Sequence, residues 1–112
     1  MGRRLTTELV GSLLSNIEPT KEFYLKDGRI VKNLIELFDA ILDMDESTFR
    51  YHRNNEKNDF YNWIMHVVCD VRLANDIARA KTKTTTLRRI KERIDYLKAI
   101  EENNLCYASN NN

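Results

Sequence analysis

The first part of the chain repeats apolar residues at helical spacing. Leu5, Leu9, Leu13 and Ile17 follow one another every four residues, which places them on one face of a helix. Pro19 comes next, and it lacks the backbone N–H that a continuing helix would need. The pattern therefore predicts a first helix that begins near Leu5 and stops before Pro19.

The next segment reads as a hairpin. Asp27 and Gly28 stand between two β-prone runs, the first beginning at Phe23 and the second ending at Val31. Both turn residues can adopt the positive φ that a two-residue turn requires. We predict a short β-hairpin at about residues 22–31.

Helical patterns then dominate. Apolar residues at 33–43 cover about half of a helical wheel, which implies burial against more than one neighbour. Asp45 is a suitable N-cap for a short helix through Tyr51, and the polar residues 53–57 are expected to form a loop.

One continuous apolar stripe follows this loop. Asn58 or Asp59 is expected to cap the helix that carries it, and Asp70 to bend that helix before the pattern continues to Ala78. The members of the stripe stand at i, i+3, i+4, i+7 and i+11: Phe60, Trp63, Ile64, Val67 and Val71.

The last helix follows a polar connector at 81–86, whose threonines include a cap. Its apolar residues Leu87, Ile90, Ile94 and Leu97 alternate in spacing between three and four. They match packing onto the helix from Phe60 to Val71, and equally the seam of a dimer, although two heptads are too few for a coiled coil alone.

Together these patterns predict a mainly α, compact single-domain bundle of about five helices with the short N-terminal hairpin. The domain should span residues 1–104, and the Asn-rich residues 105–112 should form a flexible tail. Phe60 and Trp63 should lie at the centre of the core. Their expected neighbours come from two other helices: Leu34, Phe38, Leu87 and Ile94.

Composition fits this picture and narrows the setting. At 112 residues, with 42% hydrophobic and 31% charged, the chain suits one globular domain. No apolar run approaches the roughly 18 residues of a membrane span. Cys69 and Cys106 lie far apart without a CxxC motif, which favours a reducing, cytoplasmic location over a disulfide-stabilised secreted domain.

The net charge is only +1, but the charges are unevenly placed. Residues 27–46 hold six acids and two bases. Residues 79–93 hold one acid and seven bases, which are Arg79, Lys81, Lys83, Arg88, Arg89, Lys91 and Arg93. Such a basic segment can neutralise phosphates, although charge runs are usually solvated helix faces with local ion pairs.

Two groups of polar residues are candidates for chemistry. Asp59 could orient His52 for acid–base work, but no glycine-rich loop or nucleophile elbow accompanies them, so we favour a structural hydrogen bond across the loop. His66, Cys69 and Asp70 neighbour one another on a helix, but they lack the paired spacing of zinc sites. We therefore expect no catalytic residues, no metal and no cofactor.

Several spaced residues resemble a known family. The most specific are His52, Asp59, Phe60, Trp63 and Ile64, in the order His-x6-Asp-Phe-x2-Trp-Ile. The flanking matches are Phe23-x-Leu25-x-Asp27-Gly28, Asn33-Leu34-x-Glu36-Leu37, Phe49, Asn58 and Asp70-x-x-Leu73-Ala74. Together they resemble a small archaeal and bacterial helical domain family of unknown function, over roughly residues 23–94.

The resemblance implies a compact helical domain, found alone or joined to other domains, and no established activity. Cys69 replaces a glycine common in the family, which predicts a milder bend near Asp70. Arg53 replaces a common apolar residue, which argues against tight packing of that loop.

Three functions follow as hypotheses. The first is a non-catalytic interaction module that contacts protein partners or itself. The second is a nucleic-acid- or ribosome-associated factor that binds through residues 79–93, and the third is an enzyme that uses His52 and Asp59. We favour the first, and we expect no membrane partner.

Overall fold

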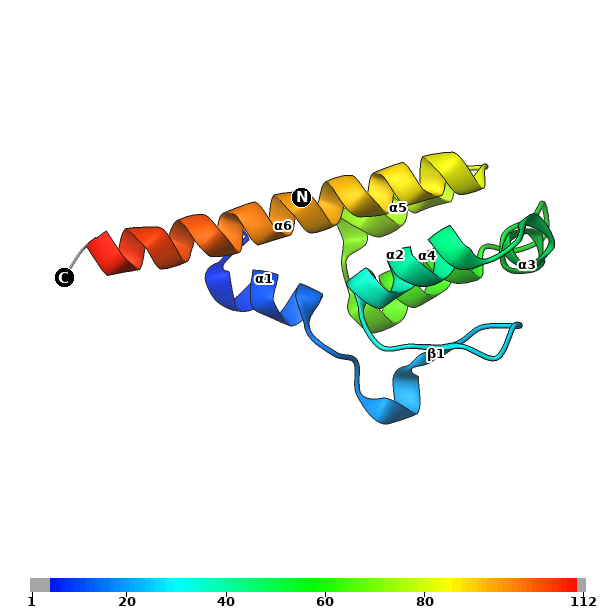
Figure 1. Cartoon of the computed structure of the whole chain (residues 1–112), viewed down its shortest axis with the longest axis horizontal. Coiled ribbons are helices and arrows are strands. Elements are labelled where there is room, and N and C mark those ends of the chain that lie inside the picture. The colour runs from blue at the N-terminus through cyan, green and yellow to red at the C-terminus, as the bar shows by residue number, and fades with distance from the viewer. Residues whose placement is uncertain (1–4, 111–112) are drawn as a thin grey trace.

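The computed structural model describes residues 5–110, and these residues are mainly helical. The elements in chain order are α1 (Thr7–Leu14), the 3-10 turn η1 (Pro19–Lys21), β1 (Phe23–Tyr24), β2 (Ile30–Val31), α2 (Leu34–Asp43), α3 (Glu46–His52), α4 (Asp59–Trp63), the π-helical turn η2 (Ile64–Val68), α5 (Val71–Arg79) and α6 (Lys83–Asn110). The long helix α6 forms one side of the molecule, with α1, α2 and α5 beside it and the hairpin on the opposite side (Figure 1). The predicted mainly α fold with an N-terminal hairpin is confirmed.

The hairpin lies where it was predicted, but its turn has three residues, 26–28, instead of two. Only Gly28 takes a positive φ, whereas the prediction required one at Asp27 as well. β1 and β2 pair antiparallel, with Phe23 opposite Val31. Gly28 has a φ of +97°, a conformation that costs glycine little, and Leu25 N–H donates to the Arg29 carbonyl at 2.9 Å. Because Phe23, Leu25 and Val31 are buried, the hairpin forms part of the core.

Each α-helix begins at a side-chain N-cap. The oxygens of Asp45 and Asn58 accept the backbone N–H groups of Thr48 and Tyr61. The other caps are Thr6, Asn33, Asp70 and Thr82. Because a cap satisfies a backbone N–H that the first turn leaves unpaired, the sequence positions of these polar residues set where the helices start.

The Asp45 cap predicts a pH-dependent stability. The Thr48 backbone N–H, followed by the Ser47 hydroxyl, lowers the pKa of the Asp45 carboxyl from its ordinary 3.8. Its stabilisation is therefore present above about pH 4 and lost as the pH falls through the folded-state pKa. We expect Asp45→Ala to lower the melting temperature at pH 7 and to have little effect at pH 2. Asp45→Asn caps without titrating, so a melting temperature with the wild-type pH dependence in that variant would contradict this account.

The first helix is shorter than predicted. α1 ends at Leu14, because the Ser15 hydroxyl and N–H both donate to the carbonyl of Ser12. Ile17 lies beyond the helix and donates its N–H to the Lys32 carbonyl at 2.7 Å. Ile17, the fourth member of the apolar repeat, is thus bonded to the residue that follows β2 and does not extend α1.

The predicted bent helix after residue 58 is divided into α4, η2 and α5, so the described chain has six α-helices where about five were expected. Cys69 takes the left-handed conformation, with a φ of +67°, and Cys69 N–H and Asp70 N–H both donate to the Ile64 carbonyl. The expectation of a milder bend was wrong. Cysteine accepts the conformation usual for glycine, at a cost of roughly 1 kcal/mol, because Asp70 then caps α5.

The buried apolar residues between Val10 and Leu97 form one cluster. Phe60 is fully buried among aromatic rings, with ring centroids 5.5 Å from Phe49 and 5.8 Å from Phe23. The expected neighbours Leu34 and Ile94 belong to the same cluster, and Phe38 and Leu87 pack at its edge.

The apolar stripe of α6 lies inside this core. Ile90, Ile94 and Leu97 are buried, and α6 packs against α1, α2 and α5. The prediction that the stripe packs on the Phe60–Val71 helix is corrected to these three partners, because the break at Cys69 directs α5 along α6. Intramolecular packing therefore uses the residues that could have formed a dimer seam.

The predicted end of the domain at residue 104 does not coincide with the end of a helix, because α6 continues to Asn110. Each residue added to an existing helix gains one backbone hydrogen bond, so a helix as long as α6 can extend beyond the core it packs on. Residues 111 and 112 of the predicted tail lie outside the described part of the chain.

Candidate functional site

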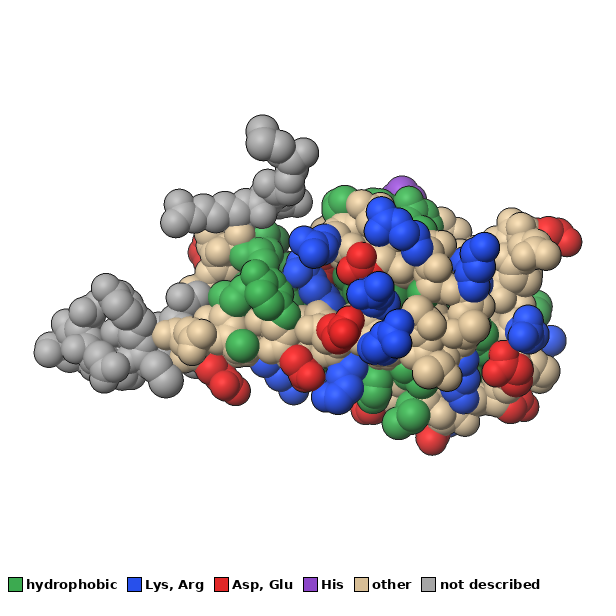
Figure 2. All heavy atoms as spheres, turned by 90° about the horizontal axis from the view of Figure 1, so that it is seen from above, with side chains coloured by type: hydrophobic (Ala, Val, Ile, Leu, Met, Phe, Trp, Pro, Cys, Tyr) green, Lys and Arg blue, Asp and Glu red, His purple; other side chains and the backbone are tan. Residues whose placement is uncertain are grey.

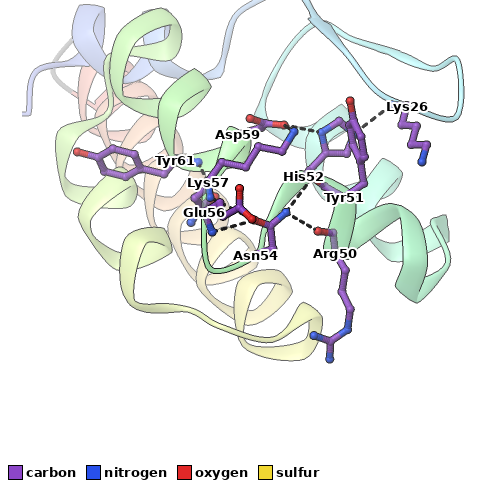
Figure 3. A network of polar contacts seen from close by, with 10 residues as sticks. Lys26, Arg50, Tyr51, His52, Asn54, Glu56, Lys57, Asp59 and Tyr61 are labelled. Atoms are coloured by element: carbon purple, nitrogen blue, oxygen red, sulfur yellow. Dashed lines mark hydrogen bonds and ion pairs between the residues drawn. The ribbon is translucent and has the colours of Figure 1, made fainter.

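Two of the signature residues, His52 and Asp59, flank the loop between α3 and α4 (Figure 3). Asn54 organises this loop: its side-chain oxygen accepts the N–H groups of Glu56 and Lys57, and its amide donates to the carbonyls of Arg50 and Tyr51. The loop thereby places the C-terminal end of α3 against the N-terminal end of α4.

His52 is a buried connection between three segments. The ring is 3% exposed, its Nδ1 lies 2.9 Å from Asp59 Oδ2, and its Nε2 accepts the Lys26 backbone N–H at 3.0 Å. Because Nε2 must accept this bond, the proton of the neutral ring belongs on Nδ1, which donates to Asp59. One imidazole thus joins the hairpin turn, α3 and α4.

This geometry leaves the imidazole little chemistry to offer a substrate. Both nitrogens are engaged, and the rings of Phe23, Tyr51 and Phe60 lie 5.0–5.6 Å from the imidazole centroid. A general acid or base must come within hydrogen-bonding reach of the proton it transfers. The arrangement matches the structural hydrogen bond that the sequence favoured.

Asp59 carries a second partner. Lys57 Nζ lies 2.9 Å from its Oδ2 and 4.0 Å from the centroid of the Tyr51 ring. The hydrogen bond to Asp59 and the charge of that carboxylate raise the pKa of Lys57 above 10.5. Lys26 approaches the same Tyr51 ring at 4.5 Å, so two cations meet one exposed aromatic side chain.

A substitution at His52 tests its structural role. His52→Phe should lower the free energy of unfolding by about 1–3 kcal/mol, because it removes the acceptor of the Lys26 N–H and one of the two partners of Asp59. The measurement is chemical denaturation followed by circular dichroism at pH 7. His66, the other histidine, is exposed, so His66→Phe should change stability by less than about 0.5 kcal/mol. Equal small losses in both variants would contradict the structural role.

Arg53 packs more closely than the sequence suggested. Its guanidinium donates to the carbonyls of Ala80, Ala78 and Asn54, at 3.1–3.2 Å. The bonds to Ala78 and Ala80 satisfy carbonyls at the C-terminal end of α5, where a cation is favoured by the helix dipole. The expectation that arginine loosens this loop was wrong.

Asp70 and Arg93 form a buried ion pair that the sequence analysis missed. Arg93 Nε and Nη2 lie 2.8 and 3.0 Å from the two carboxylate oxygens of Asp70, whose side chain is 1% exposed. Asp70 also caps α5 by accepting the Leu73 N–H. The single contact therefore fixes the start of α5 against the middle of α6.

The ion pair lines a groove between α1, α5 and α6. The groove has a volume of about 710 Å3, and Cys69, Val71 and Tyr96 form part of its exposed lining. Asp70, which the sequence grouped with His66 and Cys69, is thus held by an arginine. Within residues 5–110, no group of three or more His, Cys, Asp or Glu side chains is placed to hold a metal ion.

The seven bases of residues 79–93 do not act together. Arg93 is committed to Asp70, and Lys83 Nζ donates to the Met44 carbonyl at the end of α2. Three others lie beside acids on their own helices: Arg79 near Asp76, Arg89 near Glu92 and Lys91 near Asp95. On the face seen in Figure 2, which looks onto α6, acidic side chains lie among the basic ones.

Arg53, Lys83 and Arg93 all bind at helix ends, and the sequence predicts where several helices end. Arg53 donates to the last carbonyls of α5, and Lys83 donates to the carbonyl of the C-cap residue of α2. Arg93 binds the N-cap residue of α5. A basic residue can satisfy such an end from anywhere in the chain, so helix ends were predictable but their partners were not.

Comparisons of the chain with protein-family models, with curated proteins and with solved structures find no match. Within residues 5–110, no helix is both long and apolar enough to span a membrane.

Proposed function

We propose that this chain is a non-catalytic interaction module that contacts protein partners or a second copy of itself. One contrast supports the proposal: the polar groups that could have formed a reaction centre are used in internal contacts, while large apolar side chains remain exposed. His52, Asp70 and Arg93 belong to the first group. The second group is Tyr24, Ile30, Ile35, Leu42, Tyr51, Val71 and Tyr96.

The exposed apolar side chains lie on several elements, and some of them are more than half exposed. Leu42 is 55% exposed on α2, and Val71 and Tyr96 are each 53% exposed at the groove between α5 and α6. Tyrosine is enriched at protein interfaces, and the buried centre of an interface is more apolar than the rest of the protein surface. Adjacent exposed apolar side chains favour binding to another protein surface.

Nucleic-acid or ribosome binding through residues 79–93 is the alternative that the experiment must separate. Arg79, Lys81, Arg88, Arg89 and Lys91 are exposed, as phosphate contacts require. Acids beside three of them reduce the local positive field, which weakens this reading. Such binding would weaken steeply as salt is added.

Affinity purification of the tagged chain from its native cells, with and without nuclease, tests the proposal. We expect a discrete protein partner, or a mass that rises with concentration in ultracentrifugation, and neither should depend on nuclease. Arg79→Glu/Arg89→Glu serves as a matched variant: it should keep the partner, whereas a nucleic-acid factor should lose its ligand. A monomer without any partner, or capture abolished by nuclease, would overturn the proposal.

The cytoplasm is the location we propose. The thiol of Cys69 is exposed, and a reducing compartment keeps such a thiol unoxidised. The kinship with the small helical family of unknown function remains a prediction that rests on the signature residues, and it adds no activity to this proposal.

A further inference from the structure

An apolar stripe of α2 is left uncovered by the rest of the fold. Leu34, Leu37 and Ile41 face the core and are fully buried. On an adjoining face of the same helix, Ile35 is 36% exposed and Leu42 is 55% exposed. Phe38, between them at i+3, packs against the edge of the core. The stripe therefore begins at the core and continues into solvent.

The stripe lies next to α6. α2 packs against α6, and Lys83 near the start of α6 donates to the Met44 carbonyl at the end of α2. Leu87 stands one turn after Lys83 and is only partly buried. On α6, the buried Ile90 separates Leu87 from Arg93, and Arg93 faces α5. Leu87 is therefore on the side of α6 that faces α2. The exposed apolar strip is thus made by α2 and α6 together: Ile35, Phe38, Leu42 and Leu87.

The two edges of this strip carry opposite charges. At about 100° per residue, the order around α2 is Phe38, Leu42, Ile35, Asp39 and Asp43, so two carboxylates border the strip on the α2 side. Asp43 is paired with Arg29 of the hairpin at 3.1 Å, so Asp39 supplies most of the negative charge of this edge. By the same geometry, Lys91 stands about 40° and Arg88 about 100° outward from Leu87 on α6. Both of these cations are exposed. Asp95 stands between them, about 80° from Leu87, and pairs with Lys91 at 3.0 Å. Arg88 has no such acid among the described residues, so the α6 side keeps a net positive charge.

We propose that this strip binds the same strip of a second copy, forming a symmetric dimer whose two-fold axis runs parallel to α2. The inference rests on the proposed function and names its partner. A two-fold axis in this direction places the acidic edge of one copy against the basic edge of the other, on both sides of an apolar centre. An axis across the strip would instead oppose acid to acid, which charge repulsion disfavours.

The small area of the strip limits the affinity of the dimer. α2 has ten residues and is about 15 Å long, so the two copies share a small interface. Interfaces of this class are weak, and we expect a dimer with a dissociation constant on the order of 10–100 μM. The monomer must therefore be stable alone, as its continuous buried core allows.

Sedimentation of the full chain over a concentration series from about 1 μM to 1 mM tests the dimer. The wild type should change from monomer to dimer across this range. Leu42→Glu should raise the dissociation constant at least about tenfold, because it places a charge in the apolar centre. Val71→Glu is the matched control: Val71 has nearly the same exposure but lies at the groove on α5, so its dimer should be unchanged. Both variants are checked for wild-type circular dichroism, and Leu42→Ser replaces Leu42→Glu if the latter fails to fold.

Charge exchange tests the orientation. Asp39→Lys and Arg88→Glu should each weaken the dimer about three- to tenfold, and the double variant should return to within about threefold of the wild type. A wild type that stays monomeric at 1 mM overturns the inference, as does a dimer that Leu42→Glu leaves intact, or a double variant weaker than either single one. A monomer that still captures a discrete protein partner overturns only this inference and leaves the proposed function standing.

Discussion

Trp63→Ala should lower the free energy of unfolding by about 3–5 kcal/mol, the usual loss for a buried aromatic side chain. The indole is 7% exposed, and its ring centroid lies 5.6 Å from that of Phe23. Its Nε1 donates to the Lys21 carbonyl at 2.9 Å. Removing the side chain therefore opens a cavity between α4 and β1 and also leaves a backbone carbonyl of η1 without its donor.

The measurement is urea denaturation followed by far-ultraviolet circular dichroism, because Trp63 is the only tryptophan and its fluorescence is lost with it. Trp63→Phe is the matched control. It keeps most of the apolar volume and loses the hydrogen bond, so it should cost clearly less than Trp63→Ala. A loss below about 0.5 kcal/mol for Trp63→Ala, typical of surface positions, would show that the indole does not hold these segments together.

Arg93→Met should be comparably damaging, with an expected loss of about 3–5 kcal/mol, because it leaves the Asp70 carboxylate buried without its cation. The Asp70 side chain is 1% exposed, whereas that of Arg93 is 12% exposed. The carboxylate would keep only the Leu73 N–H, and the start of α5 would lose its link to α6. Urea denaturation at pH 7 measures the effect.

Two further variants identify the cause of that loss. Asp70→Asn/Arg93→Met removes both charges but keeps a capping oxygen, so it should recover most of the stability. Arg89→Met removes an exposed partner of Glu92 on the same helix and should cost less than about 0.5 kcal/mol. If Arg93→Met cost no more than Arg89→Met, the ion pair would not fix α5 against α6.

These two expectations bear on function as well as on stability. Residues that looked available for chemistry or for phosphate binding, such as Asp70 and Arg93, are parts of the framework. What remains for a partner is the surface the framework leaves exposed, including the strip that ends at Leu42. Binding should therefore fail in surface variants of unchanged stability, and not only in variants that unfold.

The sequence by itself determined most of the elements and where several of them start. Helical spacing located the apolar faces, Asp27 and Gly28 located the hairpin but not the length of its turn, and Asp45 and Asn58 marked N-caps. These features depend on residues within a few positions of one another, so local backbone geometry is enough to predict them. The link between His52 and Asp59 was also foreseen, because both flank one short loop.

Only the tertiary structure decided which cations are internal, which helix α6 packs on, and which apolar residues stay exposed. Arg93 and Asp70 are far apart in sequence, and local spacing gives no sign that they meet. The left-handed backbone at Cys69 arises in the same way, since Asp70 must cap α5 where α5 meets α6. Likewise Ile35 and Leu42 match a buried helical face in sequence, and they remain exposed because α6, α1 and β2 already occupy the other sides of α2. The core has room for only some of the apolar helix faces. Which faces are buried there depends on how all the helices pack together, and local sequence spacing does not contain that information.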